Sequence, residues 1–313
     1  MLTFIVRRIL ISIPTIVFVS IVVFGLQLLL PGDPALALAG EERDPQLIAE
    51  LRRLYNLDQP IWRQYLIWVG NVLQGNLGES IRLKMPVGDL VAAKLPVTMQ
   101  LASMAILIAV CVGIPMGIVS AVKKETVLDY GANVVALSGI SVPSFWLGIM
   151  MIMLFSVHLG WLPASGFVKP SESLSQNLKT MIMPAFVLSS VTTAIFMRHT
   201  RSAMLAVLRS DYVRTARAKG LREPRVVFRH ALRNAIIPVV TLGAIQLGEL
   251  MSGAVLTEQI FTIPGFGKLI VDAVFNRDYA VVQGVVLCTA TGFIFLNLCA
   301  DLIYFMVNPR MRG

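Results

Sequence analysis

Apolar residues of this 313-residue chain gather into six long runs that contain almost no charge. A bilayer interior is about 30 Å thick, so a helix rising 1.5 Å per residue crosses it with about 20 apolar residues. Each run therefore predicts a membrane-spanning helix, and the third is long enough for a span and a turn. The runs are Ile9–Leu30, Pro96–Val122, Gly131–Val168, Thr180–Met197, Ala235–Thr257 and Ala280–Ala300.

The composition agrees with this pattern. Hydrophobic residues make up 56% of the chain and charged residues only 14%, whereas soluble domains carry about 25% charged residues. We therefore predict an all-α, polytopic membrane bundle of about six transmembrane helices. The first run has 22 residues, against roughly 7–15 in a signal peptide, so we expect a retained span rather than a cleaved leader.

Basic residues predict the orientation of the bundle. Arg7 and Arg8 precede the first run, Lys123 and Lys124 follow the second, and the link from Arg198 to Arg233 carries ten Lys and Arg residues. These segments alternate so that they lie on one face, which the positive-inside rule assigns to the cytoplasm together with both termini. The same rule accounts for the net charge of +9, so no nucleic-acid partner is expected.

A long outer segment, residues 31–95, follows the first run. Asp44-Pro45 is typical of a helix start, and Pro60 to Gly75 predicts a second, amphipathic helix. These helices are expected to lie on the bilayer with Trp and Tyr as anchors, to dock a partner, or to do both.

The most informative stretch is Ser210 to Leu221, within the basic link. Ser210 or Asp211 suits a helix start, and Gly220 suits the left-handed residue that ends a helix. The predicted helix is too polar to enter lipid and too short to be stable alone. It therefore needs a partner surface, unless the segment is only a positive-inside anchor.

The segment resembles the cytoplasmic loop of permeases of ABC importers, whose pattern is Glu-Ala-Ala-x-x-x-Gly. Ala216 and Gly220 match the third position and the glycine, whereas Arg214 and Thr215 replace the first two residues. Further matches run along nearly the whole chain and are similar to the first permease subunit of dipeptide and oligopeptide importers. They include Pro31-Gly32-Asp33-Pro34, Gly75-Asn76-Leu77-Gly78-Glu79-Ser80, Leu95-Pro96-Val97-Thr98, Ser141-Val142-Pro143-Ser144-Phe145, Pro264-Gly265-Phe266-Gly267 and Arg277-Asp278-Tyr279.

The resemblance implies a type I importer permease. Residues 1–95 would form the first transmembrane helix and the helical outer loop, and residues 96–313 the permease core. Within the core, the cytoplasmic loop of residues 198–233 would couple the permease to the ATPase. It implies four kinds of partner: a second permease, two cytoplasmic ATPase subunits, an extracytoplasmic binding protein, and membrane lipid. The substrate stays open among dipeptides, oligopeptides, glutathione and nickel complexes. The residues expected to couple to the ATPase are Asp211, Tyr212, Arg214, Thr215, Ala216, Arg217, Lys219 and Gly220.

Glu249 is the charged residue inside the fifth run. A charge at the centre of a span costs about 2.5–3.5 kcal/mol and usually faces a cavity or the bundle interior. Glu249 is thus a candidate residue of the translocation path, or it lies near the outer interface if the span is shifted.

No catalytic constellation, metal site or cofactor site is expected. His158, His199 and His230 lack metal-ligand spacing, and the stretch Pro264 to Leu269 lacks the pattern of a phosphate-binding loop. ATP must then be hydrolysed by another chain. An ion-coupled secondary transporter is the alternative function, although such proteins often show repeats and paired membrane charges; a membrane enzyme is disfavoured.

Overall fold

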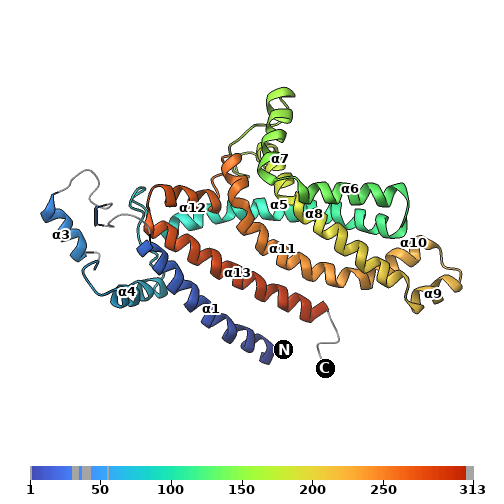
Figure 1. Ribbon diagram of the computed structural model, residues 1–313, viewed down its shortest axis with the longest axis horizontal. Helices are drawn as coiled ribbons and strands as arrows, with labels where there is room; N and C mark the ends of the chain where they lie inside the picture. The colour runs from blue at the N-terminus through green and yellow to red at the C-terminus, as the bar shows by residue number, and fades with distance from the viewer. Residues whose placement is uncertain (1, 30–34, 37–43, 55, 308–313) are drawn as a thin grey trace. The chain divides into compact units, whose positions relative to one another are not determined.

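The computed structural model describes residues 2–29, 35–36, 44–54 and 56–307 (Figure 1). Within these residues the regular elements are helices, and extended pairing is confined to one bridge between Glu79 and Pro86. The helices are α1 (Leu2–Leu29), α3 (Pro45–Leu54), α4 (Ile61–Leu73), α5 (Val87–Val122), α6 (Val127–Ser141), α7 (Ser144–Met151), the π-helix η1 (Ile152–His158), α8 (Leu174–Leu208), α9 (Asp211–Ala218), α10 (Glu223–Arg225), the π-helix η2 (Val226–Ala231), α11 (Leu232–Ile260), α12 (Phe266–Phe275) and α13 (Tyr279–Val307). The all-α class predicted from the sequence is confirmed.

Four helical stretches of the described chain are long and apolar enough to cross a membrane, or five if one bent pair counts as a span. They are Val87–Val122, Leu174–Leu208, Glu223–Met251 and Tyr279–Cys299, and the bent pair is Val127–Ser141 with Ser144–His158. The first predicted run gives a shorter apolar stretch, Leu10–Gly25, and its last residue lies outside the described part. The polytopic architecture is therefore present, and the described residues give four or five spans where the sequence predicts about six.

The third predicted span is broken rather than straight. Its halves, α6 and α7–η1, meet at an angle of 101°. Val142 is extended, with φ −82° and ψ 123°, and Pro143 precedes α7. A proline disfavours helical geometry in the residue before it, which accounts for the break.

The basic link also differs from the loop that the sequence predicted. Helix α8 continues to Leu208, so the first third of the link is helical. Glu258 and Asp278, which lie just outside the fifth and sixth apolar runs, are buried; Glu258 lies within α11 and Asp278 directly before α13. Apolar runs alone underestimated the lengths of these helices, because the helix ends carry polar residues.

The chain divides into two compact units, residues 1–97 with 264–294, and residues 98–263 with 295–313. In the first unit, α5, α12 and α13 enclose a small core of Val87, Leu90, Phe266, Leu269, Ala273, Val281 and Val285. A Cβ on Gly284 would lie 2.5 Å from Val87 Cγ1. The close approach of α13 to the start of α5 therefore requires glycine.

In the second unit, α8 packs against α6 and α11, and α5 crosses α8 closely. A Cβ on Gly113 would lie 2.6 Å from the Thr193 carbonyl oxygen, and one on Gly117 would lie 2.6 Å from that of Met197. Two glycines four residues apart let helix backbones approach, as is common in membrane proteins.

The two helices predicted in the outer segment are present as α3 and α4. Asp44 Oδ1 accepts the backbone N–H of Gln46, and Gly75 adopts φ +82° just beyond α4. Tyr65 and Trp68 contact the ring of Phe24 on α1, so these two aromatics pack on the protein rather than acting as free interfacial anchors. Trp62 remains exposed.

Candidate functional site

The predicted coupling segment, residues 210–221, forms helix α9 and its caps. Ser210 has an extended backbone, and its carbonyl oxygen accepts the N–H groups of Val213 and Arg214. Its hydroxyl donates instead to the carbonyl of Val207, at 2.6 Å. Ser210 thus begins α9 through its backbone, and α9 is about 12 Å long at 1.5 Å per residue.

Gly220 ends α9 as the sequence predicted. Its φ is +75°, its N–H donates to the Arg217 carbonyl, and the Leu221 N–H donates to the Ala216 carbonyl. These paired bonds define a Schellman motif, in which a left-handed glycine satisfies the last carbonyls of a helix. Leu221 then packs on the apolar cluster beneath α9.

One face of α9 is buried against its own chain. Val213 and Ala216 enter a cluster formed by the adjoining ends of other helices. That cluster contains Ile118 and Ala121 of α5, Met204 of α8, Val226, Val227 and Ala231 of η2, and Ala235 of α11. The partner surface that a helix this short requires is thus partly intramolecular.

The opposite face of α9 is exposed. It carries seven of the eight residues predicted to couple to a partner: Asp211, Tyr212, Arg214, Thr215, Arg217, Lys219 and Gly220. Ala216, the eighth, is 6% exposed and faces the core. Ala216 therefore seats the helix, while the other seven are available for an external contact.

Two polar clamps tie the exposed face to neighbouring elements. Arg217 donates to both oxygens of Glu223, at 2.6 and 3.1 Å, and this contact raises the pKa of the Arg217 guanidinium. The Tyr212 hydroxyl accepts from Asn234 Nδ2 at 2.8 Å. In Figure 1, α9 lies beside α10 at the end of α8 and α11.

A buried junction lies at the same end of this unit. Asp129, 3% exposed, accepts two hydrogen bonds from the Arg201 guanidinium, each 2.9 Å long. Ser120, Asn133 and the Glu125 N–H also donate to it. This Asp129 junction joins α5, α6 and α8, and sequence reasoning missed it because its partners lie 72 positions apart.

Glu249 lies on α11 three residues from the helix midpoint, and its side chain is exposed. The buried Gln246 donates to its carboxylate at 2.6 Å. A second acid on α11, Glu258, is fully buried and accepts from Thr98 at 2.5 Å. Thr98 belongs to the Leu-Pro-Val-Thr motif, and that motif was the one sequence signal that could have indicated the role of Glu258.

Two other matched motifs meet in the first unit. Ser80 donates to the buried Asp278 at 2.5 Å, and the N–H of Leu83 donates to Ser80 Oγ. The Gly-Glu-Ser and Arg-Asp-Tyr motifs are therefore joined by a side-chain hydrogen bond. The Pro31–Pro34 motif lies outside the described residues.

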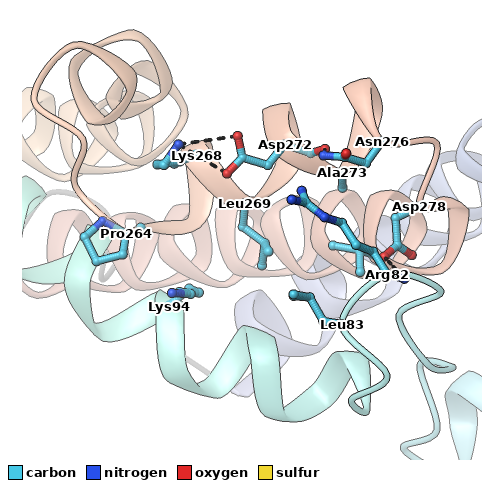
Figure 2. A pocket seen from close by; sticks show the side chains of 12 residues that line it. Arg82, Leu83, Lys94, Pro264, Lys268, Leu269, Asp272, Ala273, Asn276 and Asp278 are labelled. Carbon is cyan, nitrogen blue, oxygen red and sulfur yellow. Dashed lines mark hydrogen bonds and ion pairs between the residues drawn. The ribbon is translucent and has the colours of Figure 1, made fainter.

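Beside this contact is a cavity of about 220 Å³, shown in Figure 2. Arg82, Lys94 and Lys268 lie around it, and Lys268 pairs with Asp272 at 3.2 Å. The cavity combines basic groups with an apolar wall of Leu83, Leu269 and Val281.

In the described part of the chain, no three His, Cys, Asp or Glu side chains come together in a way that could hold a metal ion. The three histidines belong to separate elements, η1, α8 and η2.

Residues 113–313 match the family described as binding-protein-dependent transport system inner membrane component, and residues 1–102 match the N-terminal component of such systems. The chain is 46% identical to the di/tripeptide transport system permease protein DppB of Pseudomonas aeruginosa and 43% identical to the dipeptide permease protein DppB of Escherichia coli K12. It is 40% identical to the oligopeptide permease protein AppB of Bacillus subtilis. Each alignment covers all of this chain and 99 to 100% of the relative.

Among solved structures, a chain of the methionine ABC transporter MetNI in an inward-facing conformation aligns with a TM-score of 0.58 at 17% identity. The alignment covers 70% of this chain and 96% of that one. At this identity the likeness concerns the fold, and it agrees with the predicted type I permease fold. These comparisons give no support to a secondary transporter, and the chain belongs to the family of inner-membrane components of binding-protein-dependent transport systems.

Proposed function

We propose that the chain is the first permease subunit of an ATP-driven importer of peptides or related small solutes. Residues 96–313 form the permease core in this proposal, and both termini lie in the cytoplasm. A second permease completes the path, two cytoplasmic ATPase subunits supply the energy, and an extracytoplasmic binding protein delivers the substrate. The full-length similarity to dipeptide and oligopeptide permeases supports the substrate class.

The observation that carries the coupling role is the two-faced packing of α9. Its polar face is open for an ATPase, while Val213 and Ala216 rest on the ends of α5, α8 and α11. Protein interiors are close-packed and barely compressible. A displacement of α9 by an ATPase would therefore pass to three membrane helices at once.

Glu249 is proposed to line the path. It is exposed near the middle of α11, and a charged side chain in a span faces water or a protein partner rather than lipid. A carboxylate there favours the amino group of a peptide.

Charge reversal on α9 tests the coupling role. Arg214→Glu is compared with Lys124→Glu, an equal charge change in the turn between α5 and α6. Because like-charge contacts across an interface cost several kcal/mol, Arg214→Glu should lower ATP-driven uptake at least about tenfold, and Lys124→Glu should have little effect. Normal uptake by Arg214→Glu in the assembled importer contradicts the assignment.

The energy source is tested in vesicles that contain the assembled importer. Removal of ATP should abolish uptake, whereas an ionophore that collapses ion gradients should leave it intact; the opposite result restores the secondary-transporter alternative.

The Glu249 role is tested by Glu249→Gln with Glu172→Gln as control. The first variant should lower uptake of cationic relative to neutral peptides, and an unchanged ratio removes Glu249 from the path.

A further inference from the structure

A polar cavity of about 430 Å³ opens between α6 and α8, next to the Asp129 junction. Its lining residues are Asn133 of α6 and Arg198, His199, Arg201, Ser202 and Leu205 of α8. The α8 residues lie within two turns, and the pairs three or four apart, such as Arg198 with Ser202 and Arg201 with Leu205, place them on one side of that helix.

The cavity has a net positive charge, which Arg198 supplies. Arg201 is committed to Asp129 through two hydrogen bonds. Arg198 is exposed and forms no ion pair with the residues that the structure describes. No acidic side chain lines the cavity. A ligand with a net negative charge is therefore favoured over a neutral one.

A second cavity, of about 240 Å³, is lined by Ile108, Val112 and Met116 of α5 together with residues of α6, α7 and α8, so it lies on another side of the α6–α8 contact. Apolar surface beside the polar cavity is found on α6 itself. On α6, Val127, Tyr130 and Val134 are each more than 60% exposed.

We propose that the α6–α8 seam binds an anionic phospholipid. The phosphate lies in the polar cavity against Arg198, with the Ser202 hydroxyl and the His199 ring as further donors, and an acyl chain lies along the exposed Val127, Tyr130 and Val134 of α6. Basic pockets between membrane helices are suited to such headgroups. A zwitterionic lipid brings its own cation, which Arg198 repels, and a small soluble anion leaves the apolar surface uncovered.

The proposal is tested with the purified full-length chain, by native mass spectrometry after exchange into detergent. Phosphatidylglycerol and phosphatidylcholine with the same acyl chains serve as probes. We expect retained phosphatidylglycerol, about fivefold weaker retention in Arg198→Gln, and wild-type retention in Arg209→Gln, because one basic residue contributes about 1 kcal/mol to anionic lipid binding. Arg209 is an exposed residue at the end of α8 that does not line the cavity, so it matches the charge change.

Equal retention of the two lipids, or an equal loss in both variants, overturns the proposal. Displacement of the lipid by millimolar inorganic phosphate would assign the cavity to a soluble anion and also overturn it. The measurement is repeated on the assembled importer. Loss of the lipid there would mean that another subunit covers the seam, and would overturn the proposal without affecting the transport function.

Discussion

Two arginine–aspartate pairs at the same end of the second unit have similar closest N···O distances but differ in burial and in the number of hydrogen bonds. Arg201 and Asp129 lie 2.9 Å apart with side chains 27% and 4% exposed. Arg214 and Asp211 lie 3.1 Å apart with side chains 73% and 95% exposed. The first pair is a junction between helices, whereas the second lies on the open face of α9.

At this end of the unit, a buried ion pair joins helices, whereas an exposed ion pair lies on the protein surface. The Asp129 junction places its charges where water is largely absent, so they hold α5, α6 and α8 together. The coupling segment is held by apolar contacts and a glycine cap, and its charged side chains remain exposed. Four predictions test this separation.

The largest effect is expected from Asp129→Ala. Removing one partner of a buried pair leaves the other uncompensated, and because Arg201 is partly exposed we expect the low end of the usual range, a loss of about 3 kcal/mol in the free energy of unfolding. The control is Asp211→Ala, which should leave stability almost unchanged. Unfolding of the purified chain in mixed micelles measures both, and equal effects would contradict the difference in burial.

The sequence predicts the coupling segment but not the Asp129 junction. The helix of the coupling segment could be predicted because its signals are local. Gly220 follows a short helix-forming stretch, and the apolar runs on either side predict membrane-spanning helices. The sequence could not predict which face of this helix is buried, because the burial of Ala216 depends on Met204, Val226 and Ala235 around it.

Long-range polar pairs could not be predicted. Asp129 and Arg201, Thr98 and Glu258, and Ser80 and Asp278 are each separated by 72 or more positions. Nothing in the local pattern of Glu258 indicates burial, because hydropathy assigns a charge near the end of an apolar run to a loop. The break at Pro143 was visible as a proline but not as a turn of 101°.

A second effect is expected inside α9, where Ala216 is buried and Ala218 is exposed. Ala216→Leu forces extra atoms into a packed cluster and should cost about 2 kcal/mol. Ala218→Leu, on the exposed side, should change stability by less than about 0.5 kcal/mol. The same unfolding measurement applies, and a larger loss for Ala218→Leu would reverse the assigned faces.

A third, smaller effect concerns the glycine cap. A Cβ would meet no atom within 4 Å at Gly220 or at Gly131, but only Gly220 has a positive φ. Gly220→Ala should therefore destabilise the chain by about 1 kcal/mol, whereas Gly131→Ala, inside α6, should stabilise it by up to about 1 kcal/mol. Effects of the same sign would mean that backbone conformation does not govern the cap.

The smallest effect is expected at the clamp between Arg217 and Glu223. Both side chains are more than 40% exposed, so their bidentate contact should contribute no more than about 1 kcal/mol. A double-mutant cycle with Arg217→Gln, Glu223→Gln and both isolates the coupling energy from the loss of each charge.

The coupling energy should fall as salt rises, because exposed pairs are screened at distances comparable to the Debye length of about 8–10 Å. Uptake by Arg217→Gln provides the second readout. A loss of uptake that exceeds the small loss of stability, and that Glu223→Gln does not reproduce, would mean that Arg217 contacts the ATPase. Parallel losses in the two variants would confine the pair to holding α9 against α10, and would leave Arg214 and Lys219 as the basic contacts of the open face.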